Sequence, residues 1–201
     1  TSGSTGTVTY SYQGRLSTTY GPSATKPTNA GTYTVTATVA ASGNYAGASS
    51  SSVDFEISKA ALTITSSSHT VTYGDAIPTI TASYAGLVNS ESSSVISGQS
   101  CTTTYATSSS AGTSQTTSCT GGTSSNYLIS YVPGSVTVNT KTLTISGLTG
   151  SNKEFNGTRV GTATGTPTLV GKVGSDDVHL GGTPTFTFAS ANVANGISLV
   201  A

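Results

Sequence analysis

Two cysteines are the residues of this chain whose type and spacing most directly predict a covalent bond. Cys101 and Cys119 are the only cysteines in the sequence, and Ser110 lies midway between them. A turn over residues 108–112 would form a hairpin that brings the two sulfurs opposite each other. A disulfide that closes so short a loop stabilises a fold by about 3 kcal/mol in the chain-entropy model. We expect this bridge, and with it an oxidising compartment, over the alternative of two unpaired buried thiols.

The acidic side chains that could do acid–base or metal chemistry are scattered along the chain. They are Asp54, Glu56, Asp75, Glu91, Glu154, Asp176 and Asp177. The pair Asp176-Asp177 supplies two carboxylates, whereas calcium takes six to eight oxygen ligands. His69 and His179 have no companions at metal-ligand spacing. We therefore predict no metal and no cofactor.

Asp75 belongs to the motif Tyr73-Gly74-Asp75, which is followed by Pro78. It could be a calcium ligand or an acid, or a turn residue that binds its own backbone. Because the side chain of Asp commonly closes turns in this way, we expect Tyr73, Gly74, Asp75 and Pro78 to be a structural turn motif.

Motifs that position a nucleophile are missing from the sequence. It contains neither a Gly-x-Ser-x-Gly elbow nor a Walker loop, so we predict no catalytic residue and no enzymatic activity. Lys153 and Asn195 are candidates for a Lys–Asn isopeptide link, although their spacing does not establish proximity.

Hydroxyl and aromatic side chains could form a ligand-binding surface. Thr32, Thr34, Thr36 and Thr38 alternate along one segment, as in a flat array for ice or glycan, but one strand is too narrow for such a surface. Any of the 10 tyrosines could stack on a sugar. In a chain without Trp, tyrosines also have to fill small cores, so we expect at least half of them to be buried.

Composition narrows the class of protein. Charged residues make up 7% of the chain and the net charge is zero, so nothing would steer nucleic acid or an anionic membrane to it. Ser and Thr supply the missing polarity. The sequence has no apolar run of membrane-spanning length and no recognisable signal peptide, and it starts without Met, so we expect an interior or processed piece of a longer protein.

Period-two alternation of apolar residues with Thr is the dominant structural pattern. In residues 32–39 the odd positions are apolar, which predicts a strand with Tyr33 on its buried face. Residues 87–96 are the only helix candidate and should form one or two irregular turns. Pro133-Gly134 lies between two alternating segments and predicts a hairpin turn. We therefore predict an all-β or β-rich fold.

A repeated order of motifs divides the chain into modules. The order Tyr-x-Gly, Ala-Gly-Thr and Asn-Tyr appears first at 12–14, 30–32 and 44–45, and again at 84–86, 111–113 and 126–127. Each copy ends at a lysine that is followed by Leu-Thr-Ile. We predict three small modules, residues 1–59, 60–140 and 141–201, arranged end to end as a stiff rod because the joints are short.

These motifs resemble a known pair of families. Residues 60–140, with Leu62-Thr-Ile64, Tyr73-Gly74-Asp75 and Asn126-Tyr127, are similar to an MBG domain, and residues 1–59 look like a shorter relative. Residues 141–201 are similar to a YDG domain, although Phe155-Asn156-Gly157 replaces the name-giving Tyr-Asp-Gly. The resemblance implies β-grasp-like or Ig-like sandwich modules in large bacterial surface proteins of the adhesin type. Neither family supplies a catalytic residue.

Two functions follow from the resemblance and the lack of a distinctive site. The first is a structural stalk on the bacterial cell surface, whose partners are the neighbouring modules of the same protein. The second is an adhesive module that binds glycan, mucin or a neighbouring cell-surface protein. Compared with the repeat, the first module lacks its initial strands and the third lacks a final strand. A strand from another copy could pair with the exposed edge, so assembly of copies into a filament is a third alternative. We expect no nucleic-acid partner and no membrane insertion of this segment.

Overall fold

The computed structural model describes residues 6–200, and nearly all of its regular structure is short β-strand. The predicted all-β class is confirmed. The one helical element of the described residues is the 3-10 turn Ser93–Val95, which lies inside the predicted 87–96 segment. The chain forms two compact units, composed of the described residues in Thr1–His69, Pro78–Tyr105 and Ser114–Val136, and in Thr70–Ile77, Ala106–Thr113 and Thr137–Ala201.

The first module forms one sheet around a central strand. Its strands are β1 (Val8–Gly14), β2 (Gly31–Val39), β3 (Ala48–Ser49) and β4 (Val53–Ile57). Strand β2 pairs antiparallel with β1 on one edge and with β3 and β4 on the other. Tyr33 in β2 is 2% exposed, which confirms the prediction that Tyr33 faces the core.

Aromatic rings make the core of this first sheet. The ring of Tyr33 stacks on Phe55 of β4, with centroids 5.4 Å apart. Tyr20 meets the same Tyr33 ring edge to face at 5.7 Å, and Tyr12 of β1 meets Phe55 at 6.3 Å. Such pairs add to the stabilisation from burial, so a few aromatic side chains hold a module that has one sheet.

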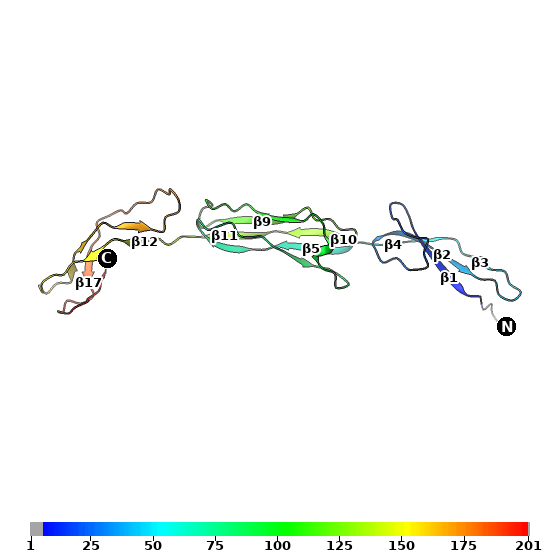
Figure 1. The fold of residues 1–201 in the computed structure, drawn as a ribbon, viewed down its shortest axis with the longest axis horizontal. Helices are drawn as coiled ribbons and strands as arrows, with labels where there is room; N and C mark the ends of the chain where they lie inside the picture. The colour runs from blue at the N-terminus through cyan, green and yellow to red at the C-terminus, as the bar shows by residue number, and fades with distance from the viewer. Residues whose placement is uncertain (1–5, 201) are drawn as a thin grey trace. The chain divides into compact units, whose positions relative to one another are not determined.

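The middle module has two sheets. The first sheet has the order β10 (Tyr127–Val132), β5 (Ala60–Ser66), β7 (Ala82–Ala85), with β5 and β10 parallel. The second has the order β6 (His69–Thr72), β11 (Gly134–Asn139), β9 (Ser114–Thr120), β8 (Ser100–Thr103). Figure 1 shows β5, β9 and β10 running alongside one another.

One hydrophobic core joins these two sheets. Leu62 and Ile64 of β5 and Tyr127 of β10 cluster with Cys119 of β9, and each is at most 3% exposed. The buried hydroxyl of Ser66 lies 3.0 Å from that of Thr117, and both are hydrogen-bonded. The middle module is therefore a sandwich of two sheets, with no helix packed on either sheet among the described residues.

The interpretation of Pro133-Gly134 as a hairpin turn is wrong. Strand β10 ends at Val132 and β11 begins at Gly134, but the two strands belong to different sheets. The Gly134 amide donates to the Ser66 hydroxyl at 2.8 Å. A Cβ on Gly134 would lie 2.7 Å from the Ser66 carbonyl oxygen, so glycine is needed where the chain passes between the sheets.

The two Tyr-x-Gly marks occupy different places in their modules. In the first module this mark lies in β1, which pairs with the central strand β2. In the middle module it overlaps β7, which is an edge strand and pairs with β5 in the first of the two sheets. The two marks align in sequence, yet they are not topological equivalents, because strand pairing depends on segments distant in the chain.

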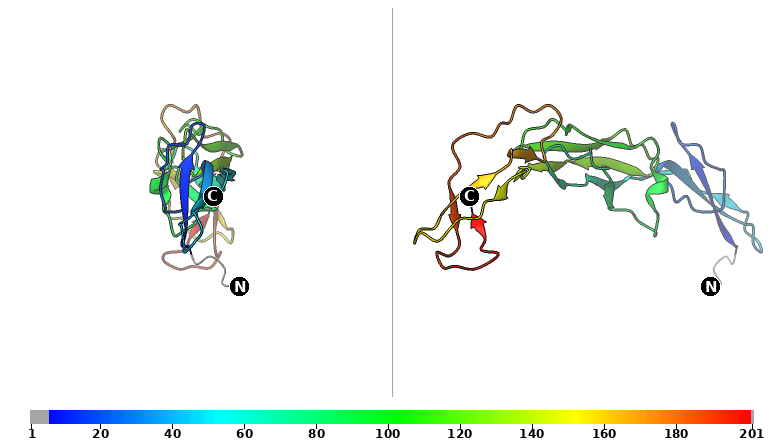
Figure 2. Two further views of the ribbon diagram at one scale, coloured as in Figure 1. Left: turned by 90° about the vertical axis from the view of Figure 1, so that its right-hand side faces the viewer. Right: turned by 60° about the vertical axis from the view of Figure 1, so that its left-hand side comes forward.

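The third module contains only very short strands. They are β12 (Thr144–Ser146), β13 (Thr149–Gly150), β14 (Val160–Gly161), β15 (Ala163–Thr164), β16 (Thr168–Val170), β17 (Phe186–Phe188) and β18 (Leu199–Val200). They form three small sheets of two or three strands. Figure 2 shows these short arrows separated by long connections at the C-terminal end of the colour scale.

Candidate functional site

The two cysteines lie opposite each other in the hairpin of β8 and β9. Cys101 pairs with Cys119 in the strand register, their Cα atoms are 4.0 Å apart, and their sulfurs are bonded. Cys119 is 2% exposed and belongs to the core of the middle module. The bond thus ties the edge of one sheet into the shared core, which is a structural role.

The Tyr73-Gly74-Asp75 segment forms a closed turn after β6. The Asp75 amide donates to the Thr72 carbonyl oxygen at 2.9 Å, and Asp75 Oδ2 accepts from the Thr72 amide at 2.8 Å. Gly74 has φ of 86°, in the left-handed region that favours glycine. These contacts support the turn role of the carboxylate. Pro78 is half-buried and follows the turn.

Two tyrosine hydroxyls bind carboxylates that lie far away in the sequence. Tyr73 donates to Asp176 Oδ1 at 3.1 Å, and this hydrogen bond raises the pKa of the tyrosine. Tyr127 donates to the Glu91 carboxylate and accepts from the Val88 amide at 2.9 Å. The bond to Glu91 is the main cause that raises the pKa of Tyr127. Sequence reasoning assigned no partner to either tyrosine, since no local pattern connects residues so far apart.

The described residues contain no group of three or more His, Cys, Asp and Glu side chains that could hold a metal ion. Asp176 accepts the Tyr73 hydroxyl, while the exposed Asp177 carboxylate contacts the His179 ring. An exposed ion pair joins Arg15 to Asp54. Within residues 6–200, no helix is long and apolar enough to cross a membrane.

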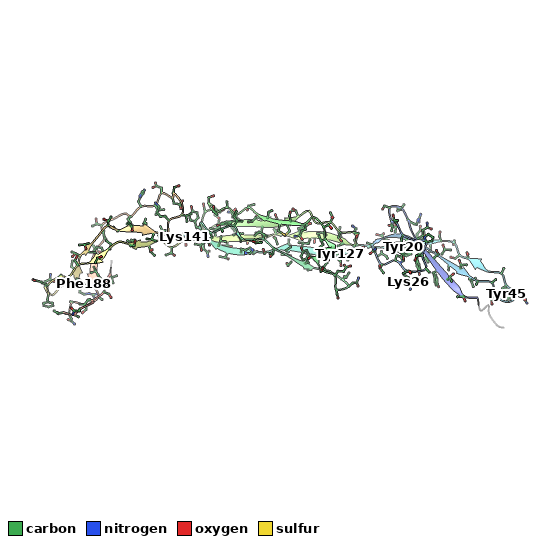
Figure 3. The ribbon with its side chains drawn as sticks, in the orientation of Figure 1. Tyr20, Lys26, Tyr45, Tyr127, Lys141 and Phe188 are labelled. Carbon is green, nitrogen blue, oxygen red and sulfur yellow. A yellow bond between two sulfur atoms is a disulfide. The ribbon has the colours of Figure 1, made fainter. Side chains whose placement is uncertain are left out.

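Lys153, a candidate for an isopeptide link with Asn195, binds a nearby loop instead. Its Nζ donates to Asn156 Oδ1 at 2.8 Å and to the Thr158 carbonyl oxygen at 2.8 Å. It also lies 5.8 Å from the centroid of the Phe188 ring, which Figure 3 labels. These contacts connect Lys153 with residues 156–160 and with β17, and they do not include Asn195.

A cavity of about 500 Å³ opens at the end of the first sheet. Residues 16–20 fold over the start of β2 and the end of β4 to form it. Its polar lining includes Thr18, Thr19, Tyr20, Thr32, Glu56 and Lys59. The Glu56 carboxylate is exposed and accepts one long bond, 3.4 Å, from Ser58. Hydroxyls, one carboxylate and an aromatic ring suit a polyhydroxylated ligand.

The threonines of β2 belong to a wider polar face. Thr34, Thr36 and Thr38 lie opposite Gln13, Ser11 and Thr9 of β1, while Thr32 and Thr34 lie opposite Glu56 and Asp54 of β4. The face therefore spans three strands and leads to the cavity. Sequence reasoning treated it as one strand, because register between strands is not visible in a local pattern.

Fewer tyrosines are buried than predicted. Of the 10 tyrosines, the buried ones are Tyr33, Tyr105 and Tyr127, so the expectation that at least half are buried is wrong. Tyr45, at the tip of the β2–β3 connection, is 69% exposed, whereas Tyr127 lies inside the middle module (Figure 3). Tyr10, Tyr12, Tyr20 and Tyr45 lie in the first module, whose single sheet has no second sheet among the described residues to cover it.

Comparison with protein families assigns three domains in tandem. Residues 1–61 match an MBG domain, residues 62–137 an MBG domain of YGX type, and residues 139–200 a YDG domain. The chain therefore contains two MBG domains followed by a YDG domain, and the predicted resemblance is confirmed. MBG and YDG domains suggest an adhesin-like surface protein. Neither the comparison with curated proteins nor that with solved structures gives a match.

Proposed function

We propose that this chain is a structural stalk segment of a bacterial cell-surface protein, located outside the cell and without enzymatic activity. The observation that carries the proposal is the short joint between the two MBG domains. Ser58 and Lys59 alone separate β4 from β5. A joint of this length restricts the bending of one module against the next, as a spacer that bears load requires.

Hydrogen bonds at this joint support the same role. Within the first compact unit, Lys59 Nζ donates to the Ser124 carbonyl oxygen at 2.9 Å. Asn126 accepts from the Ala30 amide at 3.0 Å and donates to Asn29 Oδ1 at 3.1 Å. The Asn of the repeated Asn-Tyr motif thus contributes to the joint, in addition to the covalent chain.

Small-angle scattering of the full chain tests the stalk. We expect a maximum dimension well above that of a compact protein of the same mass, and a longer, more flexible profile after a Gly-Ser insertion between Ser58 and Lys59. A profile that fits a single compact sphere would contradict the proposal. An unchanged profile after the insertion would show that the joint does not set the stiffness.

A second candidate function is adhesion through a glycan, and the cavity of the first module favours it. Glu56 and Tyr20 line this cavity at the end of the polar face. Glycan-array binding that is lost in Glu56→Gln, and retained in the matched variant Glu154→Gln of the third module, would support adhesion. Arrays without binding would leave the stalk as the function.

A further inference from the structure

An asparagine–glycine pair in the third module is surrounded by hydrogen bonds. Asn156 Oδ1 accepts from Lys153 Nζ at 2.8 Å, from the Thr158 amide at 3.1 Å and from the Thr158 hydroxyl at 2.9 Å. Lys153 Nζ also donates to the carbonyl oxygens of Thr158 and Val160, at 2.8 and 3.0 Å. One amide oxygen therefore receives three donors, one of which is an ammonium group.

These donors withdraw electron density from the side-chain carbonyl of Asn156. Its Cγ is consequently a better electrophile than that of a solvated asparagine amide. The next residue, Gly157, has φ of 74°, and nothing lies within 4 Å of the position that a Cβ would take. Because Gly157 has no Cβ, no side chain on residue 157 shields its amide nitrogen from Asn156 Cγ.

We propose that Asn156 is a site of spontaneous deamidation, and that the aspartate it yields is retained by Lys153. The Gly157 backbone nitrogen attacks Cγ, forms an N–Cγ bond and gives its proton to water. The Cγ–Nδ2 bond breaks and ammonia leaves, which produces a succinimide. Water then cleaves the N–Cγ bond, which restores the normal backbone and leaves a side-chain carboxylate. The net reaction consumes one water and releases one ammonia, without oxidation or reduction.

The loop is already arranged for this product. A carboxylate has the shape of the amide, and its oxygen accepts the same bonds from Lys153 and Thr158. The four oxygens that Lys153 now binds are all uncharged. A charged acceptor makes a shorter and stronger bond to an ammonium. The product would also place an Asp at the middle position of the motif for which YDG domains are named. This modification is independent of the proposed stalk role.

Lys153 itself is poorly placed to attack Asn156. Its ammonium group donates to four oxygens, and an ammonium nitrogen has no lone pair with which to attack Cγ. A Lys153–Asn156 isopeptide would lose ammonia without gaining water and would join the two side chains. Peptide mapping distinguishes the two outcomes by mass.

The chain holds its own control. Asn195-Gly196 is the second Asn-Gly pair, Gly196 has φ of 69°, and nothing lies within 4 Å of its Cβ position. The bonds of Lys153 all lie within residues 156–160. Local sequence and steric access are therefore similar at the two sites, whereas the ammonium contact differs.

The experiment is incubation of the full chain at neutral pH, followed by peptide mapping with fragmentation that separates aspartate from isoaspartate. We expect Asn156 to deamidate several-fold faster than Asn195 in the same sample, with aspartate as the main product. In Lys153→Met the rate at Asn156 should fall to that of Asn195, and in denaturant the two sites should react equally.

Three results would overturn the proposal: equal rates at the two sites in the native chain, an unchanged rate in Lys153→Met, or isoaspartate as the main product. Formation of a Lys153–Asn156 crosslink would do the same. Because each variant is compared with its own Asn195, partial unfolding of the third module by Lys153→Met would appear as a rise at both sites.

Discussion

The middle and third modules begin with the same Leu-Thr-Ile sequence but bury it to different degrees. In the middle module Leu62 is 1% exposed and Ile64 is 0% exposed. In the third module Leu143 is half-buried and Ile145 is 58% exposed. One local pattern therefore serves as a core strand in one module and as a surface strand in the other.

Strand pairing accounts for this difference. Strand β5 pairs with β10 on one edge and β7 on the other, and the second sheet contributes Cys119 to its core. Strand β12 pairs with β16 alone. Among residues 141–200 no apolar side chain is buried, and Phe155, Val160 and Val193 are each at least 67% exposed. The third module thus has little hydrophobic stabilisation of its own. A module that begins with Leu-Thr-Ile therefore does not always form a buried core.

Truncation of the matched isoleucines tests the comparison most strongly. Ile64→Ala should lower the free energy of unfolding of the middle module by about 2–5 kcal/mol, because it leaves a cavity in a packed core. Ile145→Ala should change the stability of the third module by less than about 0.5 kcal/mol, since its side chain is already exposed. Native-state hydrogen exchange reads each module separately. Equal losses in the two variants would show that the third module has a core after all.

Removal of the disulfide should have the next largest effect. Its loop spans 18 residues, and the chain-entropy model gives a loss of about 3 kcal/mol for the Cys101→Ser, Cys119→Ser double variant. Chemical denaturation followed by hydrogen exchange should place this loss in the middle module. Reduction of the native protein is the control, and a loss spread equally over the third module would contradict the assignment.

Two aspartates, Asp75 in the middle module and Asp177 in the third, test the same difference in stability with smaller expected effects. Asp75→Ala removes the bond from the Thr72 amide and should cost about 1 kcal/mol in the middle module. Asp177→Ala removes an exposed contact with His179 and should have almost no effect. Thermal unfolding with and without calcium provides the measurement. Calcium-dependent stabilisation that disappears in Asp75→Ala would mean that the turn binds a metal.

The pH dependence of the middle module should show the smallest effect. The hydrogen bond to Glu91 raises the pKa of Tyr127 above its usual value near 10. Above that pH the unfolded tyrosine loses its proton first, so folding binds more protons and stability falls as pH rises through the folded pKa. Tyr127→Phe should remove this part of the alkaline loss. An identical alkaline slope in the variant, measured by urea unfolding, would exclude Tyr127 as its source.

Local patterns in the sequence predicted several parts of the fold well. Alternation over residues 32–39 identified the central strand β2 and the buried Tyr33, since a strand places successive side chains on opposite faces. Composition predicted the all-β class, and the ordered motifs predicted the MBG and YDG domains. The paired cysteines were found from spacing, because their hairpin is local.

The sequence did not predict the contacts between segments that are far apart in the chain. The chain crosses between sheets at Pro133 where a hairpin was predicted, because β10 pairs with β5, more than 60 residues earlier in the chain. The cavity of the first module and the polar face beside it depend on the register of three strands. The carboxylate partners of Tyr73 and Tyr127 likewise lie in other segments.

The sequence by itself determined the all-β class and the central strand at residues 32–39, because side-chain alternation acts over a few neighbouring positions. Tertiary structure alone decided which strands are buried. Burial of Ile64 and exposure of Ile145 follow from the number of strands and sheets that cover each side chain. That coverage depends on pairing between segments far apart in the chain, and the identical Leu-Thr-Ile pattern holds no information about it.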